Sequence, residues 1–210
     1  MLDVKCLISS FIQPWRTSRF TDIHQAPWDF VGDIEALLRQ QIAGLDPLYT
    51  CVEDVAVHHS ATIEAGAVVK GPAIIGPNCF IAATAYLRGG VYLERDCVIG
   101  PSSELKTTVV FAGSKLAHLN FVGDSVIGAD VNIEAGAIIA NYRNELEGRN
   151  IRIANRGQVI DTGVNKFGAL VGDGSRIGAN AVIAPGALLE PASIVGRLQL
   201  IDQNSEIELT

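Results

Sequence analysis

Aromatic residues are scarce in this chain. Phe, Trp and Tyr make up 6% of its 210 residues, although 48% of all residues are hydrophobic and glycine occurs 21 times. Large rings dominate most globular cores, so their scarcity indicates a narrow interior filled by small and β-branched side chains. The length fits one domain, or one domain with a small appendage.

Other absences exclude several functions. The formal net charge is −7, so we expect no electrostatic attraction to nucleic acid or to an anionic membrane. No apolar run approaches the roughly 18 residues of a membrane helix, and the start "MLDVKCLISSFIQ" lacks the regions of a signal peptide. The four cysteines show no CxxC spacing. A cytoplasmic protein with reduced thiols is therefore expected.

An apolar residue recurs every six positions along the chain, and the residue two positions before each is mostly small. Side chains two apart on a strand share a face, so each unit sends one small and one branched side chain inward before it turns. This six-residue repeat, called the beat below, restarts in a shifted register at Phe121 and again at Val171. Its first run comprises Cys51, Val57, Ile63, Val69, Ile75, Ile81, Leu87, Leu93, Ile99, Leu105 and Phe111. This pattern predicts a parallel β-helix.

The pattern resembles the hexapeptide-repeat family of left-handed β-helices, whose three-sided coils take 18 residues. The left hand comes from this resemblance, because parallel crossovers are ordinarily right-handed. Residues 18 apart should then stack on neighbouring coils, roughly 4.8 Å apart. Cys79 and Cys97 are expected to stack inside the β-helix as small core thiols.

The repeat defines three regions. Residues 1–50 form an N-terminal segment in which "APWDFVGDIEALLRQQIAG" predicts a helix, expected to cap the open end of the β-helix. Residues 51–200 form the β-helix, and residues 201–210 form a C-terminal tail. An inserted loop at 143–164 interrupts the repeat, and long loops of this kind are more often functional than idle.

The beat is lost after Phe111 and resumes two residues out of step at Phe121. The interval contains His118, whereas the other three histidines lie before residue 60. Such irregularities re-aim side chains beside active sites. The interruption therefore marks His118 as the candidate catalytic corner.

A metal site is the alternative use of these histidines. A γ-class carbonic anhydrase built from hexapeptide repeats would need three zinc-binding histidines on neighbouring faces. Only His118 lies in the middle of the repeat. No metal site is therefore expected.

Two basic residues have an informative spacing. Arg88 and Lys106 are 18 apart, and each directly follows an inward residue, so both should point outward on adjacent coils. Two stacked cations repel each other unless an anion lies between or above them, and a phosphate or diphosphate would supply it. Two solvated surface cations remain the alternative.

Longer motifs resemble an enzyme family. "YLRGG", "ELK" and "GSKLAHLNFVGDSVIGADVNIEAGAIIANY" are similar to the acetyltransferase half of the bifunctional glucosamine-1-phosphate acetyltransferase / N-acetylglucosamine-1-phosphate uridyltransferases. "DTGVNKFGALVGDGSRIGANAVIAPGALL" resembles the archaeal-type bifunctional sugar-phosphate nucleotidylyltransferase/acetyltransferases. The chain has no room for a nucleotidyltransferase domain and no "GxGTR…K" loop, so nucleotidyl transfer is not expected.

The resemblance implies roles for residues of the acceptor site. His118 would be the general base that takes a proton from the substrate amine, a task suited to an imidazole because it titrates near neutral pH. Glu104 would orient that imidazole. Arg88 and Lys106 would hold the sugar phosphate, in agreement with their spacing.

The resemblance also implies the remaining contacts. Asn132 would bind the sugar, while Asn141 and Tyr142 would polarise the acetyl carbonyl and seat the acyl-CoA. Phe121 replaces a substrate-binding tyrosine of the family, which removes one hydrogen bond worth about 1 kcal/mol. The acceptor sugar is therefore expected to differ. The 143–164 insertion follows Tyr142 and could reshape donor choice or cover the site.

The expected function is CoA-dependent N-acyl transfer to an amino-sugar phosphate or nucleotide-linked amino sugar. Acetyl-CoA would be the co-substrate, no metal would be required, and a homotrimer would place the site between subunits, as the resemblance implies. The alternative is a non-catalytic β-helix scaffold or sugar-nucleotide-binding protein derived from such an enzyme.

Overall fold

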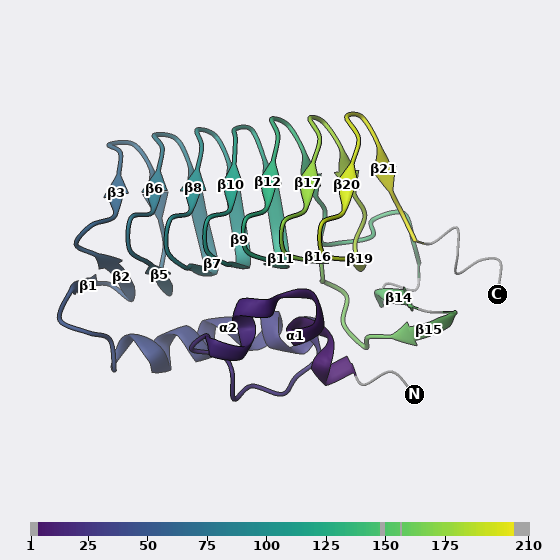
Figure 1. Cartoon of the computed structure of the whole chain (residues 1–210), viewed down its shortest axis with the longest axis horizontal. Helices are drawn as coiled ribbons and strands as arrows, with labels where there is room; N and C mark the ends of the chain where they lie inside the picture. The colour runs from purple at the N-terminus through teal and green to yellow at the C-terminus, as the bar shows by residue number, and fades with distance from the viewer. Residues whose placement is uncertain (1–3, 148–149, 156, 204–210) are drawn as a thin grey trace.

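A parallel β-helix forms the main body of the chain (Figure 1). The computed structural model describes residues 4–147, 150–155 and 157–203. Each coil has three sides, and the strands of one coil pair in parallel with those of the next. The fold class predicted from the hexapeptide beat is confirmed.

The strands fall into two long sheets and one hairpin. The seven-stranded sheet, here the first side, comprises β3 (Thr62–Ile63), β6 (Phe80–Ile81), β8 (Val98–Ile99), β10 (Lys115–Leu116), β12 (Asn132–Ile133), β17 (Arg176–Ile177) and β20 (Ile194–Val195).

The twelve-stranded sheet bends at a corner and supplies the other two sides. The second side contains β4 (Val68–Val69), the first halves of β7 (Tyr86–Leu93), β9 (Glu104–Val110) and β11 (Phe121–Ile127), and β13 (Ile138–Ile139), β18 (Val182–Ile183) and β21 (Leu200–Ile201). The third side contains β2 (Val55–His58), β5 (Ala73–Ile75), the second halves of β7, β9 and β11, and β16 (Ala169–Val171) and β19 (Ala187–Leu189).

Small and aliphatic side chains fill the inside of the coils. The interior cluster contains no aromatic residue in the part of the chain that the structure describes. Cys79 and Cys97 both lie in this cluster, and the neighbouring residues Phe80 and Val98 are opposite each other on adjacent coils. The predicted stacking of the two thiols at a spacing of 18 is confirmed.

After Leu105, the residues that point into the coils differ from those expected. Val110, Leu116 and Val122 point into the coils, whereas Phe111 packs outside them in the helix-facing cluster and Phe121 is partly exposed. Assigning Phe111 and Phe121 to the interior was therefore wrong. A ring at either position would not fit an interior lined by small and branched side chains.

The irregularity of the repeat lies at a different corner of the coil from the one predicted. Leu105 is opposite Val122, and Val122 is opposite Ile139, so each of these two coils is one residue shorter than the expected 18. The missing residue is at the corner between the second and third sides, where β7 and β9 show a register shift next to Arg88. The shortening therefore lies after Lys106, and not at His118.

Two helices lie along the third side. They are α1 (Leu7–Phe11), flanked by the 3-10 turns η1 (Val4–Cys6) and η2 (Gln13–Thr17), and α2 (Pro27–Ile42). Helix α2 contacts β5, β7, β9 and β11 in turn, so it runs across successive coils (Figure 1). The predicted helix is confirmed, but its expected position on the open end was wrong.

An outward apolar ladder explains the position of α2. One residue per coil of the third side points toward the helices, at the spacing of the repeat: Ala56, Ile74, Tyr92, Val109, Val126, Leu170 and Leu188. Most aromatic rings of the chain gather here. The rings of Trp15 and Phe30 lie 4.9 Å apart, and those of Phe20 and Tyr92 5.0 Å apart. This second core buries apolar surface that would otherwise face water.

The ends of the β-helix also differ slightly from the prediction. Cys51 lies in β1 (Tyr49–Val52), which pairs antiparallel with β2, and it is exposed rather than inside a coil. The last strand, β21, pairs with β18 and carries the β-helix to Ile201. Residues 204–210 of the predicted tail lie outside the described residues.

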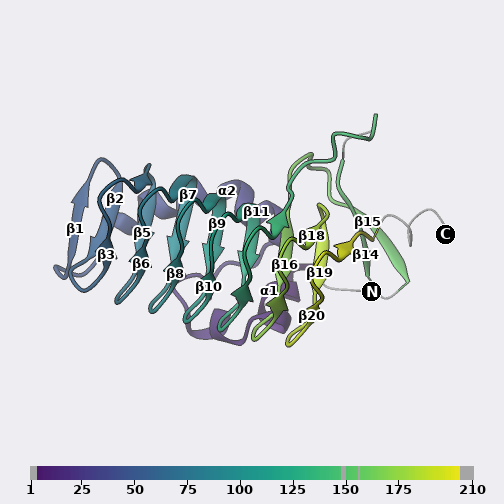
Figure 2. The same cartoon turned by 90° about the horizontal axis from the view of Figure 1, so that it is seen from above.

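The predicted insertion leaves the coils after β13 and projects beyond them (Figure 2). It contains a hairpin of β14 (Arg152–Asn155) and β15 (Gln158–Asp161), and its Ile151 and Ile153 join the helix-facing core. Within the part of the chain that the structure describes, no helix is long and apolar enough to cross a membrane.

Candidate functional site

Arg88 and Lys106 meet at the corner between the second and third sides. They are directly opposite each other on β7 and β9, as their spacing predicts. The Arg88 guanidinium pairs with Glu104, with Nε 2.8 Å and Nη2 2.6 Å from Oε1. The chain's own carboxylate therefore offsets part of the repulsion between the cations, and Glu104 contacts Arg88 rather than an imidazole.

Lys106 has a carboxylate partner of its own. Its Nζ lies 3.0 and 2.9 Å from the two oxygens of Asp124 and 3.2 Å from Thr107 Oγ1. The Asp124 side chain is 9% exposed and that of Lys106 19%. Asn141 donates a hydrogen bond to the same carboxylate from Nδ2. The structure thus connects two predicted site residues, Lys106 and Asn141, through Asp124.

Gly123 makes this close approach sterically possible. A Cβ added at Gly123 would lie 2.8 Å from Cγ and Nδ2 of Asn141 and 2.9 Å from the ring of Phe121. Real Cβ atoms do not approach other heavy atoms so closely, so a side chain here would displace Asn141. The predicted Phe121 borders the same cluster on the second side, opposite Glu104.

His118 lies at the other edge of the second side. It occupies the bend between β10 and β11, is exposed, and accepts a hydrogen bond from the backbone N–H of Gly136 at its carbonyl oxygen. The structure does not bring its imidazole to Glu104, whose carboxylate is held by Arg88. The outward surface between His118 and Lys106 includes Glu104 and Phe121.

Asn132 and Tyr142 lie apart from this cluster or at its margin. Asn132 is exposed on the first side, where it is opposite Lys115 and Arg176. Tyr142 follows Asn141 and is partly buried. A single chain therefore does not collect all the predicted site residues on one surface.

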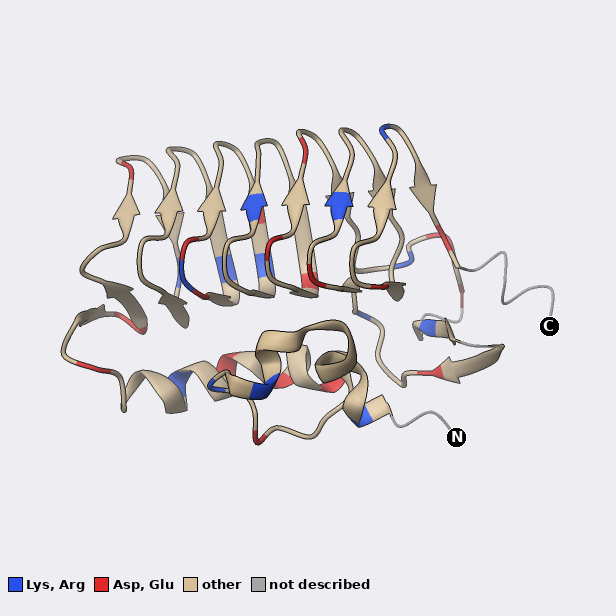
Figure 3. Cartoon of the chain, in the orientation of Figure 1, with Lys and Arg blue, Asp and Glu red and all other residues tan. Residues whose placement is uncertain are grey.

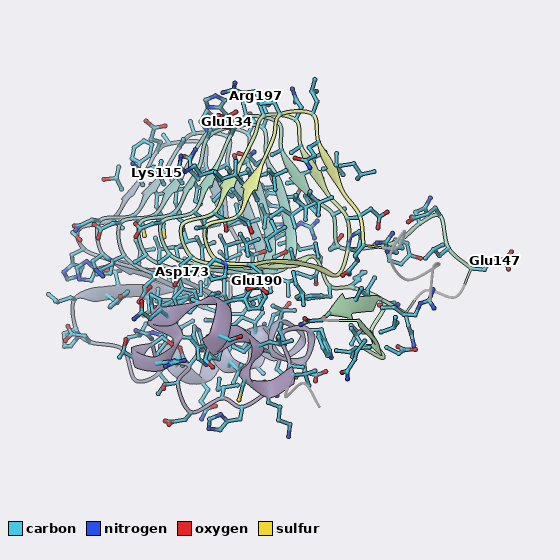
Figure 4. The ribbon with its side chains drawn as sticks, turned by 45° about the vertical axis from the view of Figure 1, so that its right-hand side comes forward. Lys115, Glu134, Glu147, Asp173, Glu190 and Arg197 are labelled. Atoms are coloured by element: carbon cyan, nitrogen blue, oxygen red, sulfur yellow. The ribbon has the colours of Figure 1, made fainter. Side chains whose placement is uncertain are left out.

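A small cavity of about 240 Å³ lies beside Asn132 on the first side, lined also by Arg176 and Arg197. At its rim, Arg197 and Glu134 point toward each other from corners that are two coils apart (Figure 4), with Nε 2.8 Å from Oε2. Hydrogen bonds from Arg197 and from the backbone N–H of Ala179 lower the pKa of the Glu134 carboxyl. This ion pair therefore spans the corner at Ala179 and connects three successive coils.

The corner that carries Arg88 and Lys106, here called the cationic corner, also includes Asp124 and Lys70, which were not predicted from the sequence. Lys70 lies one coil before Arg88 at the same corner, because Val69 is opposite Leu87. The spacing of 18 that pairs Arg88 with Lys106 also connects Lys70 with Arg88 and Lys106 with Asp124. A search for charged residues at that spacing could have found both.

Comparisons with known proteins agree with this fold. The family model described as bacterial transferase hexapeptide (six repeats) matches residues 72–107, and the hexapeptide repeat of succinyl-transferase matches residues 161–196. Both matched segments of the chain therefore consist of hexapeptide repeats. Repeats of this type therefore lie on both sides of the 143–164 insertion.

The chain is also similar to parts of larger enzymes. It is 36% identical over 129 residues to the bifunctional protein GlmU of Methanococcus vannielii, which covers 61% of the chain and 30% of that protein. It is 38% identical over 149 residues to a bifunctional sugar-1-phosphate nucleotidylyltransferase/acetyltransferase of Sulfurisphaera tokodaii, which covers 68% of the chain and 37% of that protein. The chain spans about a third of the length of these curated relatives.

Among solved structures, the N-acyltransferase AntD of Bacillus cereus, crystallised as a mutant with dTDP and coenzyme A, matches with a TM-score of 0.38 and 19% identity over 70% of each chain.

Proposed function

We propose that this protein is a CoA-dependent N-acyltransferase, with acetyl-CoA as the donor, that acts on an amino-sugar phosphate or a nucleotide-linked amino sugar. The observation that carries the proposal is the partly exposed cluster of Arg88, Glu104, Lys106, Asp124 and Asn141. The relative named as a bifunctional sugar-1-phosphate nucleotidylyltransferase/acetyltransferase supports the reaction class.

His118 is the proposed general base. The acceptor amine attacks the thioester carbonyl, and His118 takes the proton released from nitrogen. The C–S bond then breaks to give the amide, and His118 returns the proton to the departing thiolate to form the CoA thiol. His118 suits this step because its imidazole is exposed at the edge of the second side. Asn141 and Tyr142 would polarise the carbonyl and seat the acyl-CoA.

The cationic corner is the proposed anion site. Lys106 and Arg88 retain partly exposed side chains, 19% and 36%, although both are paired. A guanidinium has five donors, so Arg88 can keep Glu104 and still donate to a phosphate oxygen. Lys106 can keep Asp124 and exchange its contact with Thr107 Oγ1 for a phosphate oxygen. Asn132 would contact the sugar from another surface.

A homotrimer would complete the site. The second side carries exposed apolar residues that a neighbouring subunit could cover: Ile138 is 39% exposed, Val182 37% and Leu200 61%. Exposed apolar rows of this kind mark interaction surfaces. Since Asn132 and Lys106 lie on different sides of one chain, a site between two chains can bring such residues together.

A non-catalytic scaffold or sugar-nucleotide-binding protein is the second candidate. The observation that favours it is that Arg88 and Glu104 satisfy each other, so Glu104 does not orient His118 within the chain. Such a protein would bind the acceptor without transferring an acyl group.

The deciding experiment measures release of the CoA thiol from acetyl-CoA with glucosamine 1-phosphate and a panel of amino sugars and nucleotide-linked amino sugars. His118→Ala should lower kcat by about 10²–10⁴-fold, the usual contribution of a general base. His59→Ala is the matched control, because it removes another exposed histidine far from the cluster. Equal thiol release by the wild type and the His118→Ala variant would favour the non-catalytic protein.

A second measurement addresses the anion site. Lys106→Ala should raise KM for a phosphorylated acceptor more than for its unphosphorylated analogue. An equal change for both acceptors would remove the phosphate assignment.

A further inference from the structure

Lys70 extends the cationic corner toward the start of the β-helix. Its Nζ lies 5.3 Å from the centre of the Tyr86 ring, and Arg88 Cζ lies 5.7 Å from the same centre. Unlike Arg88 and Lys106, the exposed Lys70 makes no ion pair with any residue in the described part of the chain. Figure 3 shows basic segments on the successive strands β7 and β9, and Lys70 continues this row by one coil.

The row is longer than a single phosphate requires. Neighbouring coils lie about 4.8 Å apart, so the corners of Lys70 and Lys106 are separated by about 10 Å. A monophosphate at Arg88 and Lys106 leaves Lys70 unused. A diphosphate can contact all three coils through charge-assisted hydrogen bonds.

A cavity of about 420 Å³ continues beyond Lys70. It falls in the range of small-molecule sites, roughly 300–1,000 Å³. Three valines give it apolar walls suited to the faces of a base and a ribose. The exposed Glu53 carboxylate accepts no hydrogen bond from the described residues, and a carboxylate can accept from both hydroxyls of a ribose. The lining residues are Val52, Glu53, Val55, Val69, Lys70 and Gly71.

The turn that presents Glu53 is held in place. Glu53 and Asp54 have φ values of 48° and 62° in the turn between β1 and β2. Asp54 is tied to helix α2 by Arg39, with Nε 3.2 Å from Oδ2. A Cβ added at Gly71 would lie 2.5 Å from the Glu53 carbonyl oxygen, so this turn packs directly against the corner that follows Lys70. The cavity wall is therefore part of the packed structure.

We propose that the acceptor is a nucleoside diphosphate-linked amino sugar rather than a simple sugar 1-phosphate. Its nucleoside occupies the cavity beside Glu53, its diphosphate spans Lys70, Arg88 and Lys106, and its sugar extends from there over the second side. This inference rests on the proposed function, because it assigns the acceptor of the same site.

The test is a calorimetric titration of the full-length protein with UDP, ADP, inorganic diphosphate and glucosamine 1-phosphate. A nucleoside diphosphate should bind at least tenfold more tightly than inorganic diphosphate. Lys70→Gln should weaken that binding about tenfold, as expected for loss of a charge-assisted hydrogen bond. Glu53→Gln should weaken nucleoside diphosphate binding roughly fivefold and leave inorganic diphosphate unchanged.

Lys115→Gln is the matched control, because Lys115 is an exposed lysine on the first side, away from the row. All three substituted side chains are exposed, so circular dichroism should show unchanged folds. Equal affinities for inorganic diphosphate and both nucleoside diphosphates would overturn the proposal. An unchanged affinity in Lys70→Gln would do the same.

The titration separates this inference from the proposed reaction. Binding of a nucleoside diphosphate that depends on Lys70 and Glu53, without any thiol release, would keep the acceptor assignment and reject the acyltransferase. Thiol release with glucosamine 1-phosphate that is insensitive to Lys70→Gln would keep the acyltransferase and reject the nucleoside site.

Discussion

Removing the carboxylate of Asp202 should destabilise the protein through the buried Arg143. The Arg143 side chain is 2% exposed, and its Nη2 lies 2.6 Å from Asp202 and 3.2 Å from the Pro185 carbonyl oxygen. Burial acts to lower the pKa of the Arg143 guanidinium, but the hydrogen bond and charge of Asp202 outweigh it and raise that pKa. An arginine side chain does not deprotonate in proteins, so the guanidinium stays charged when Asp202 is removed.

The size of the effect follows from these contacts. Breaking a buried ion pair by removing one partner costs about 3–5 kcal/mol. Asp202 is 30% exposed, and Arg143 keeps Pro185 and Glu145 as partners, so water and these groups recover part of the loss. We expect Asp202→Ala to lower the free energy of unfolding by about 2–3 kcal/mol.

The assay is urea unfolding followed by tryptophan fluorescence at one fixed protein concentration. Trp28 is a suitable reporter because its ring lies 6.0 Å from that of Phe167, where the chain returns from the insertion. Glu145→Ala is the control, since the 60% exposed carboxylate should contribute less than about 0.5 kcal/mol. A loss in Asp202→Ala no larger than in Glu145→Ala would refute the reasoning.

The same variant tests the acyl-CoA assignment. Arg143 directly follows Asn141 and Tyr142, so its anchorage to Asp202 fixes the direction in which the chain leaves β13. If these two residues seat the acyl-CoA, Asp202→Ala should raise KM for acetyl-CoA more than KM for the acceptor. A change confined to the acceptor would place the donor elsewhere.

Three further variants probe the second side. Phe121→Tyr restores a hydroxyl beside Glu104, and a hydrogen bond from it to the acceptor would be worth about 1 kcal/mol. KM for one acceptor of a panel should therefore fall roughly fivefold. KM values that are unchanged for every acceptor would argue against a contact between residue 121 and the acceptor. Gly123→Ala should cost about 1–3 kcal/mol in urea unfolding and reduce kcat, because its Cβ would displace Asn141; full activity would show that Asn141 is dispensable. Ile138→Asp should shift the mass measured by light scattering from trimer to monomer, and an unchanged trimer would place the interface on another side.

The regular part of the fold was predictable because the repeat constrains every coil alike. A six-residue repeat that sends one small and one aliphatic side chain inward requires strands stacked coil on coil. The spacing of Cys79 and Cys97 therefore sufficed to place their side chains next to each other on adjacent coils. The position of the helices was less obvious, although the sequence contains the signal. Ile74 and Tyr92 are outward apolar residues 18 apart, and a search for outward apolar residues at that spacing would have predicted a helix along the third side.

The site was harder to predict because its contacts depend on exceptions to the repeat. Counting back in steps of six from Ile139 leads to Phe121 only if the shortening of the coils by one residue each is ignored. The side chain that points inward is that of its neighbour Val122. The partner of Glu104 could not be read from the sequence either. Arg88 and His118 are both candidates for an ion pair with it, and the corner geometry selects Arg88.

The shortened coil explains how Asp124 reaches Lys106. In a coil of 18 residues, Asp124 would be directly opposite Lys106 on the next strand. With one residue removed, Gly123 takes that register position, and Asp124 moves into the turn with φ 45°. From there its carboxylate reaches back to Lys106 and accepts from Asn141 on the following coil. The interruption of the repeat therefore positions a carboxylate between the proposed anion site and the proposed donor site, and Gly123 leaves the space in which Asn141 meets it.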